Sequence, residues 1–280
     1  MLNKRLLAWL LVFVFIGGAI LASALVFRVQ DVRVHFAHTQ TVFVDKDEAT
    51  DSFERIVTNV AGGRNIIIGL NRNRIIRAVE EADPRIRVRQ IEARFPNRLN
   101  VRVQERFPMY FIQYGGLTAI LDYQLQIVSN ERRFVDGGID IGEGWRLIDI
   151  SEQFTLNKYF MTFEIGDNLS QFAPYDVGRM ETLILMSRLF FGQKIMEEEI
   201  CHLVEKIDFN ASDAPPNTMV MVLRDPLRWT TSIRIEIRDF GYNFNDKLAR
   251  AWWVLQHETD YRQGILIVYP DLQVSWELTT

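Results

Sequence analysis

The chain has 280 residues, 48% hydrophobic and 24% charged, a composition typical of folded protein with room for about two domains. Its formal net charge of −4 argues against a dedicated nucleic-acid binder. The single cysteine, Cys201, excludes an intrachain disulfide, so the fold depends on its hydrophobic core.

The first feature along the chain is an uncharged apolar stretch at residues 6–27. As a helix it would measure about 33 Å, enough to cross a hydrocarbon core about 30 Å thick. Lys4 and Arg5 precede it and favour a cytoplasmic N-terminus. We therefore expect residues 1–5 in the cytoplasm, one transmembrane helix at 6–27 and everything later outside the cytoplasm. The alternative is a cleaved signal peptide, because Ala22-Ser23-Ala24 fits the cleavage pattern.

Residues 28–108 show the pattern of a small α+β domain. Alternating apolar and polar residues predict a strand at 32–36. A cap at Asp45 or Asp47 with an acidic first turn begins a first helix, which a glycine stop at Gly62-Gly63 ends, and Asn71 and Pro84 bound a second. The predicted inner faces of the two helices carry Phe53, Ile56, Val57 and Val60, and Ile75, Ile76, Val79 and Ala82.

Two further strands complete this domain, joined by a turn at Pro96-Asn97-Arg98. Ile91, Ala93 and Phe95 share one face of the first strand. The second strand presents Leu99, Val101 and Val103 inward, with Arg102 and Gln104 outward. The order strand, helix, helix, strand, strand predicts a three-stranded sheet with both helices on one face.

Residues 109–280 are richer in short strands. A hairpin is predicted within 118–129 and a glycine-rich acidic loop at 136–144. Helices are expected at 176–191, 194–208 and 245–258, and strands at 218–224, 231–238, 264–269 and 272–278. The whole chain is thus expected to be α+β, with a transmembrane helix, a small domain at 28–108 and a strand-rich β domain at 109–280.

Catalytic chemistry finds little support in the residues. No nucleotide-binding glycine loop, nucleophile elbow or zinc-protease motif is present, and the four histidines are not at ligand spacing. We therefore predict no enzyme, no catalytic residue, no metal and no cofactor. The arginine-rich stretch 71–106 has three interpretations: a protein-partner face, contact with anionic lipid head groups, or a solvated sheet face.

The sequence resembles the bacterial divisome family FtsQ/DivIB, in which a span is followed by a POTRA domain and a β domain. The resemblance rests on Pro84 after the second helix, the turn Phe95-Pro96-x-x-Leu99 and the ending Val103-x-Glu105-Arg106-x-Pro108. It implies a non-enzymatic, single-pass type II inner-membrane scaffold at the division septum. Such a scaffold binds FtsB-like, FtsL-like and other division proteins, and helps recruit and regulate septal peptidoglycan synthesis without binding nucleic acid or a small-molecule substrate.

The resemblance also implies a partner site in the last strands, formed by addition of a partner strand to an exposed sheet edge. The residues expected there are Gly264, Ile265, Leu266, Ile267, Val268 and Tyr269, with Trp253 nearby. A second partner face on the POTRA domain would carry Arg94, Arg98 and Arg102. The alternative function is a POTRA-type chaperone or secretion module that binds extended polypeptides outside the cytoplasm.

Overall fold

The computed structural model describes residues 9, 12–18, 22, 26–37, 41–67, 69–131, 147–157, 162–192, 200–201, 203–223, 233–257 and 264–277. The chain forms two compact units, Met1–Arg106 and Phe107–Thr280. Among the described residues no helix combines the length and the apolar character that crossing a membrane requires. Part of the predicted transmembrane stretch 6–27 and the whole glycine-rich loop 136–144 lie outside the described residues.

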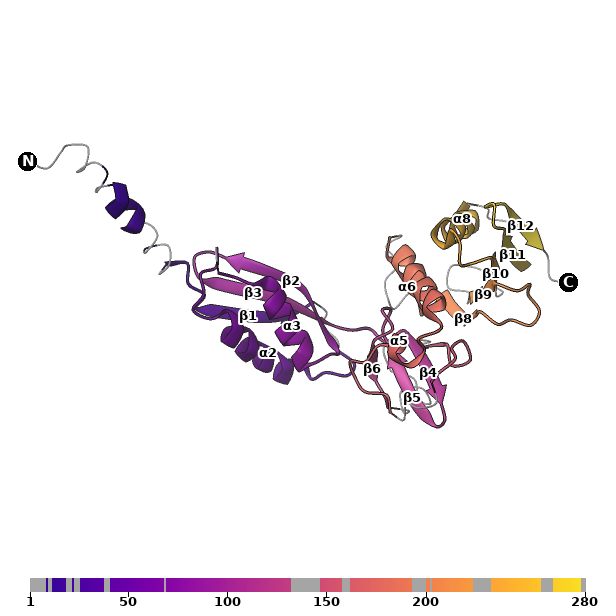
Figure 1. Cartoon of the computed structure of the whole chain (residues 1–280), viewed down its shortest axis with the longest axis horizontal. Helices are drawn as coiled ribbons and strands as arrows, with labels where there is room; N and C mark the ends of the chain where they lie inside the picture. Colours follow the sequence, from indigo (N-terminus) through magenta and orange to yellow (C-terminus); the bar gives the residue numbers. More distant parts are fainter. Residues whose placement is uncertain are drawn as a thin grey trace, which may run out of the picture. The chain divides into compact units, whose positions relative to one another are not determined.

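The first unit contains the predicted strand–helix–helix–strand–strand order (Figure 1). Its elements are β1 (Asp31–Phe36), α2 (Lys46–Ala61), α3 (Arg72–Ala82), β2 (Ile86–Arg94) and β3 (Arg98–Glu105). β3 is the middle strand, parallel to β1 and antiparallel to β2. Figure 1 shows α2 and α3 together on one face of this sheet.

Side-chain caps explain where the two helices begin. The Asp45 carboxylate accepts the N–H groups of Asp47 and Glu48, at 3.0 and 3.2 Å. The Asn71 side chain accepts the N–H of Arg74 at 3.1 Å. Each cap satisfies backbone donors that the first turn of a helix leaves unpaired.

The core of this unit lies between the helices and the sheet. The sheet contributes the alternating residues predicted from the sequence, since Leu99, Val101 and Val103 are fully buried. The helices contribute Phe53, Val57, Ile75 and Val79. Two predictions are wrong. Phe95 lies in the turn after β2 and is exposed rather than on the inner face, and Ala82, at the end of α3, is also exposed.

The second unit is built on one nine-stranded sheet with the order β12-β11-β10-β9-β8-β7-β4-β5-β6. The strands are β4 (Tyr110–Tyr114), β5 (Leu117–Leu121), β6 (Ile127–Ser129), β7 (Ile148–Asp149), β8 (Val204–Asp208), β9 (Thr218–Leu223), β10 (Ile233–Arg238), β11 (Gly264–Val268) and β12 (Val274–Glu277). β5 and β6 pair as the predicted hairpin.

Three helices accompany this sheet: α5 (Leu169–Phe172), α6 (Val177–Gly192) and α8 (Phe244–His257). Ser187 of α6 hydrogen-bonds the Tyr110 hydroxyl at 3.1 Å, which places α6 over β4. Phe190 of α6 meets Trp252 of α8 edge to face, with ring centroids 5.2 Å apart. The helix predicted at 194–208 is wrong at its end, because Val204–Asp208 pairs with β9 as a strand.

Candidate partner-binding surfaces

The predicted edge strand is not an edge. β11, which holds Gly264 to Val268, lies between β10 on one side and β12 on the other. Its backbone groups are therefore used in the sheet, and Leu266, Ile267 and Val268 are buried. The prediction fails because the chain turns back after β11 and places its last strand, β12, on the outer side of β11.

The open edge is β12, one strand further along the chain. In the described part of the chain it has a strand neighbour on one side only. The opposite end of the sheet is different, because residues 166–169 cover β6 and the residues before it. Ile127 donates its N–H to Asp167 O at 2.7 Å, and Leu169 donates to Leu125 O at 2.9 Å. One edge is thus closed by the protein itself, and the other offers backbone donors and acceptors.

The turn before β12 is held by specific contacts. The N–H of Tyr269 donates to Gln273 O at 2.9 Å, and the Ser275 hydroxyl donates to the Tyr269 hydroxyl at 3.3 Å. The guanidinium of Arg238 lies over the Tyr269 ring, 4.7 Å from its centroid. Tyr269 therefore lies in the turn and supports β12, while Val274, Ser275 and Trp276 are half-buried.

Trp253 lies on the solvent side of α8 and is 45% exposed. Its ring stacks on His257 with centroids 4.8 Å apart, and the Arg250 guanidinium lies 4.8 Å from its ring centroid. An exposed aromatic ring flanked by a guanidinium and an imidazole is of the kind found in protein interfaces. Sequence reasoning found Trp253 but not its two neighbours.

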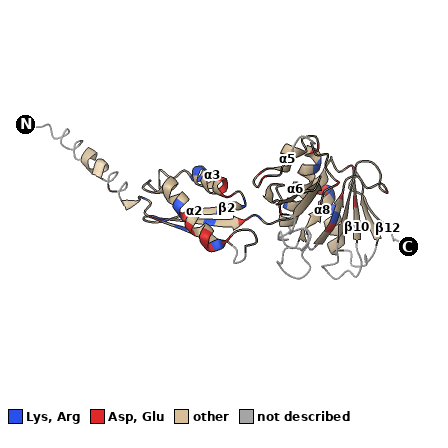
Figure 2. Cartoon of the chain, turned by 90° about the horizontal axis from the view of Figure 1, so that it is seen from below, with Lys and Arg blue, Asp and Glu red and all other residues tan. Residues whose placement is uncertain are grey.

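The structure brings Arg94, Arg98 and Arg102 to one face of the POTRA-like sheet, opposite the helices. Arg94 lies across from Arg98, and Gln90 lies across from Arg102. Arg94 pairs with Glu92 at 2.9 Å and Arg98 with Asp31 at 2.6 Å. Arg102 makes no ion pair among the described residues. Acidic residues gather instead on α2, on the other face of the sheet (Figure 2).

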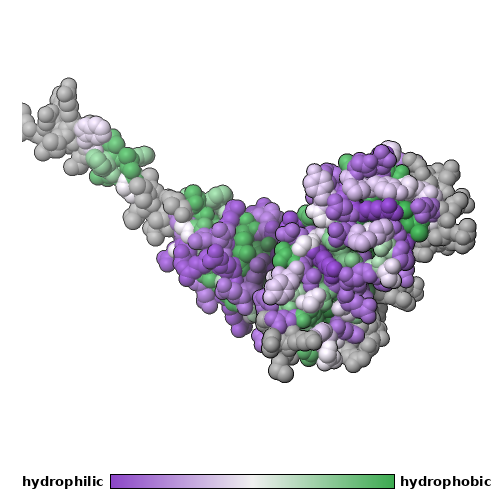
Figure 3. Space-filling view, turned by 45° about the vertical axis from the view of Figure 1, so that its right-hand side comes forward, coloured by the Kyte–Doolittle hydropathy of each residue, from purple (hydrophilic) through white to green (hydrophobic). Residues whose placement is uncertain are grey.

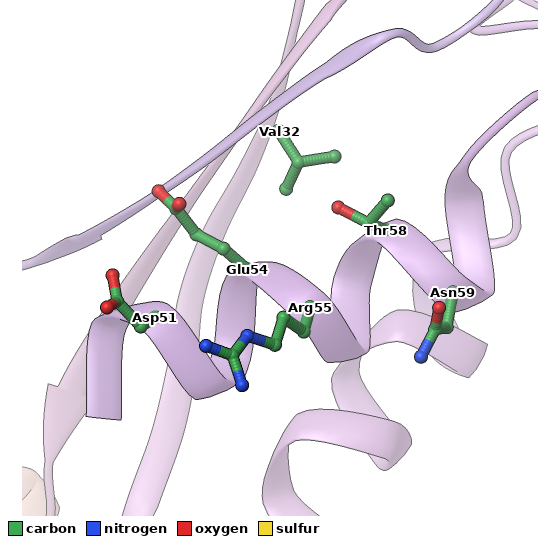
Figure 4. A pocket seen from close by; sticks show the side chains of 6 residues that line it. All are labelled: Val32, Asp51, Glu54, Arg55, Thr58 and Asn59. Atoms are coloured by element: carbon green, nitrogen blue, oxygen red, sulfur yellow. The ribbon is translucent and has the colours of Figure 1, made fainter. Parts of the chain in front are cut away.

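A helix covers the outer edge of β1. The Glu54 carboxylate of α2 accepts the N–H of Val34 at 3.0 Å, which occupies an edge donor that a partner strand would need. Figure 4 shows Glu54 pointing to the strand, with Val32 facing the same hollow of about 460 Å³. This edge is therefore poorly suited to strand addition.

The edge of β2 is more open. Glu80 accepts the N–H of Val88 at 3.1 Å near the start of the strand. Beyond that point the strand borders a groove of about 960 Å³. The groove is lined by Ile66, Ile67, Arg72, Ile76 and residues 88–95. The sequence predicted the strand at 272–278 but neither this groove nor the position of β12 at the open edge, because an edge is defined by pairing partners distant in the sequence.

No cluster of three or more candidate metal ligands occurs among the described residues. The shifted ionisable groups have structural explanations. Burial lowers the pKa of Lys247, whose ammonium donates to Arg238 O and Asp239 O at 3.0 and 2.6 Å. Burial also raises the pKa of Tyr110, whose hydroxyl is bonded to Ser187. Both groups are occupied inside the core rather than directed into a cleft.

Comparison with known proteins bears on the first unit. Residues 55–106 match the family model of the POTRA domain, FtsQ-type, a range that begins in α2 and ends with β3. No curated protein matches the chain. The matched range contains the end of α2 and all of α3, β2 and β3. The chain therefore carries a POTRA domain of FtsQ type, which supports the resemblance to the FtsQ/DivIB family.

Proposed function

We propose that the chain is a non-enzymatic scaffold of the bacterial division septum, anchored in the inner membrane by one N-terminal span. An FtsQ-type POTRA domain suggests a membrane-associated scaffold of cell division. The span is supported by helical residues 12–18, whose apolar side chains are exposed. Such a surface is unfavourable in water and natural in lipid.

The proposed partners are FtsB-like and FtsL-like proteins, and the proposed contact is strand addition to β12. The open edge of the nine-stranded sheet is the observation that carries this proposal. An incoming strand would pair with the outward backbone groups of β12, while its alternate side chains meet the half-buried Val274 and Trp276. Trp253 on α8 is proposed as a neighbouring contact.

A second candidate function is a module that captures extended polypeptides outside the cytoplasm. The groove along β2 favours it, because an edge strand beside apolar side chains suits an unfolded segment. The location of the protein in cells distinguishes the two functions. A scaffold of division concentrates at the septum, whereas a general polypeptide-binding module is distributed around the envelope.

The binding test uses Val274→Pro. In an antiparallel pair of strands, hydrogen-bonded residue pairs alternate with pairs that are not hydrogen-bonded. Tyr269 and Gln273 are hydrogen-bonded, so the next pair, Val268 and Val274, is not. The Val274 N–H therefore points away from β11. Proline removes this outward donor and is tolerated at an edge. Val274→Ala is the matched control, since it keeps the donor and shortens the side chain.

We expect Val274→Pro to reduce the amount of FtsB-like protein that co-purifies by at least about tenfold, which corresponds to a loss of about 1.4 kcal/mol of binding free energy. Val274→Ala should retain most binding, and both variants should keep a native circular dichroism spectrum. Equal binding by the proline variant would place the interface elsewhere. A fluorescent fusion that stays diffuse in dividing cells, with normal septa after depletion, would overturn the scaffold function itself.

A further inference from the structure

Two large apolar side chains are exposed at one end of the POTRA domain. Phe95, in the turn between β2 and β3, is 65% exposed, and Ile67, in the loop before α3, is 55% exposed. Neither contributes to the core below. Isolated exposed apolar residues are common, but these two lie at the same end of one domain.

Both residues adjoin the point at which the apolar N-terminal stretch enters the domain. The Phe27 ring packs edge to face against Phe95, with centroids 5.8 Å apart. The Phe27 carbonyl accepts the N–H of Ile66 at 2.8 Å, which places the loop of Ile67 beside it. Figure 3 shows hydrophobic surface where the N-terminal segment joins this domain.

The charges around this end are mainly positive. Four arginines belong to it: Arg28, Arg64, Arg94 and Arg98. The carboxylates nearby are those of Asp31 and Glu92, which already pair with Arg98 and Arg94 at 2.6 and 2.9 Å. Arg28 and Arg64 are exposed and make no ion pair within the described residues.

The geometry points to a lipid-contact patch, which we define as Phe95, Ile67, Arg28, Arg64, Arg94 and Arg98. We propose that it lies against the anionic head groups of the membrane in which the chain is anchored. Apolar side chains enter the boundary between acyl chains and head groups, and arginines bind phosphate. The inference rests on the proposed membrane span.

The length of chain between span and domain favours lipid over a protein occupant. Three residues lie between Phe27 and Asp31, the first residue of β1, so four Cα–Cα steps join the two. Fully extended, these steps span at most about 14 Å. In the structure the approach is closer, because Phe27 packs against Phe95 with ring centroids 5.8 Å apart, within the screening length of about 8–10 Å in physiological salt. This end of the domain is therefore held within electrostatic reach of the head groups. A protein strand in the adjoining groove of β2 is the competing occupant.

The experiment places a fluorophore at either end of the POTRA domain in the full-length protein. Asn97→Cys labels the turn within the patch, and Ala82→Cys labels the exposed end of α3, at the opposite end of β2, a strand about 25 Å long. Cys201 is buried, so labelling is selective. The protein is reconstituted in vesicles of phosphatidylethanolamine and phosphatidylglycerol that contain a head-group nitroxide quencher.

We expect at least about threefold stronger quenching at position 97 than at position 82. The difference should disappear with Phe95→Ser combined with Ile67→Ser, and should fall in pure phosphatidylcholine. Both substituted residues are exposed, so circular dichroism should stay native. Equal quenching at the two positions in protein that resists alkaline carbonate extraction would overturn the patch and favour a protein occupant. Extraction by carbonate would instead overturn the membrane span.

Discussion

The indole of Trp276 lies against the backbone of Gly264, where an added Cβ atom would come within 2.9 Å of the ring. The same Cβ would clash with Glu277 O, in the neighbouring strand. Gly264 also has φ +145°, a conformation that glycine adopts and other residues rarely do. The first residue of β11 therefore has to be glycine for β12 to pair with it.

Gly264→Ala is expected to lower the free energy of unfolding of the C-terminal unit by about 1–3 kcal/mol. It should also weaken strand addition at β12, because the clash displaces the edge. Urea titration followed by tryptophan fluorescence measures the first effect. Gly241→Ala serves as the control, since nothing lies within 4 Å of a Cβ placed there. Equal stability of the two variants would contradict the clash.

Ile267→Pro is expected to unfold the C-terminal unit or destabilise it by about 3 kcal/mol or more. Ile267 is buried in a strand with neighbours on both sides, so its backbone cannot lose a donor without cost. Val274→Pro at the edge should be far milder. Circular dichroism melts of the two variants make the comparison, and similar melting temperatures would contradict the assignment of β12 as the open edge.

The POTRA domain could be predicted closely because its signals are local. Alternation identified Leu99, Val101 and Val103 as inner residues, and helix caps identified the starts of α2 and α3. The alternation failed at Phe95, where the strand had already ended. Gln104 does lie on the outer face, as predicted, but it is buried, because the Arg89 guanidinium at the bulge in β2 folds over it as a hydrogen-bond donor.

The candidate site was harder to predict, because the position of a strand in its sheet depends on distant partners. β10 and β11 pair in parallel across α8, and β12 then adds by a hairpin. One local signal for this was present: residues 265–268 are all apolar, a run typical of strands buried on both faces. Residues 204–208 likewise became a strand through pairing with β9 rather than through local preference.

Glu105 gives the POTRA domain a predictable response to pH. Its carboxylate, at the end of β3, accepts the N–H groups of Val42 and Phe43, the latter at 2.7 Å. Burial raises the pKa above its ordinary value of 4.5, although these hydrogen bonds oppose the shift. Because the folded pKa is the higher one, the folded state binds more protons between the two values. The contribution of Glu105 to stability is then complete below pH 4.5 and falls as pH rises through the folded pKa.

Glu105→Gln removes this titration while keeping an acceptor oxygen. We expect the stability difference, wild type minus variant, to be largest in acid and to decrease as pH rises past the folded pKa. Urea unfolding of the full chain at a series of pH values measures it, with Glu48→Gln on the exposed first turn of α2 as the control. A difference that instead grows with pH would show that the hydrogen bonds outweigh burial.

Lys247→Met is expected to destabilise the C-terminal unit by about 2 kcal/mol, although methionine matches the lysine stem in size. The Lys247 side chain is fully buried, and its ammonium holds Arg238 O and Asp239 O where β10 turns toward α8. Methionine leaves both carbonyl groups without this donor. Lys206→Met, at a largely exposed lysine of β8, is the control and should change stability by less than about 0.5 kcal/mol. If the two variants unfold at the same urea concentration, the buried ammonium has no structural role in holding this turn.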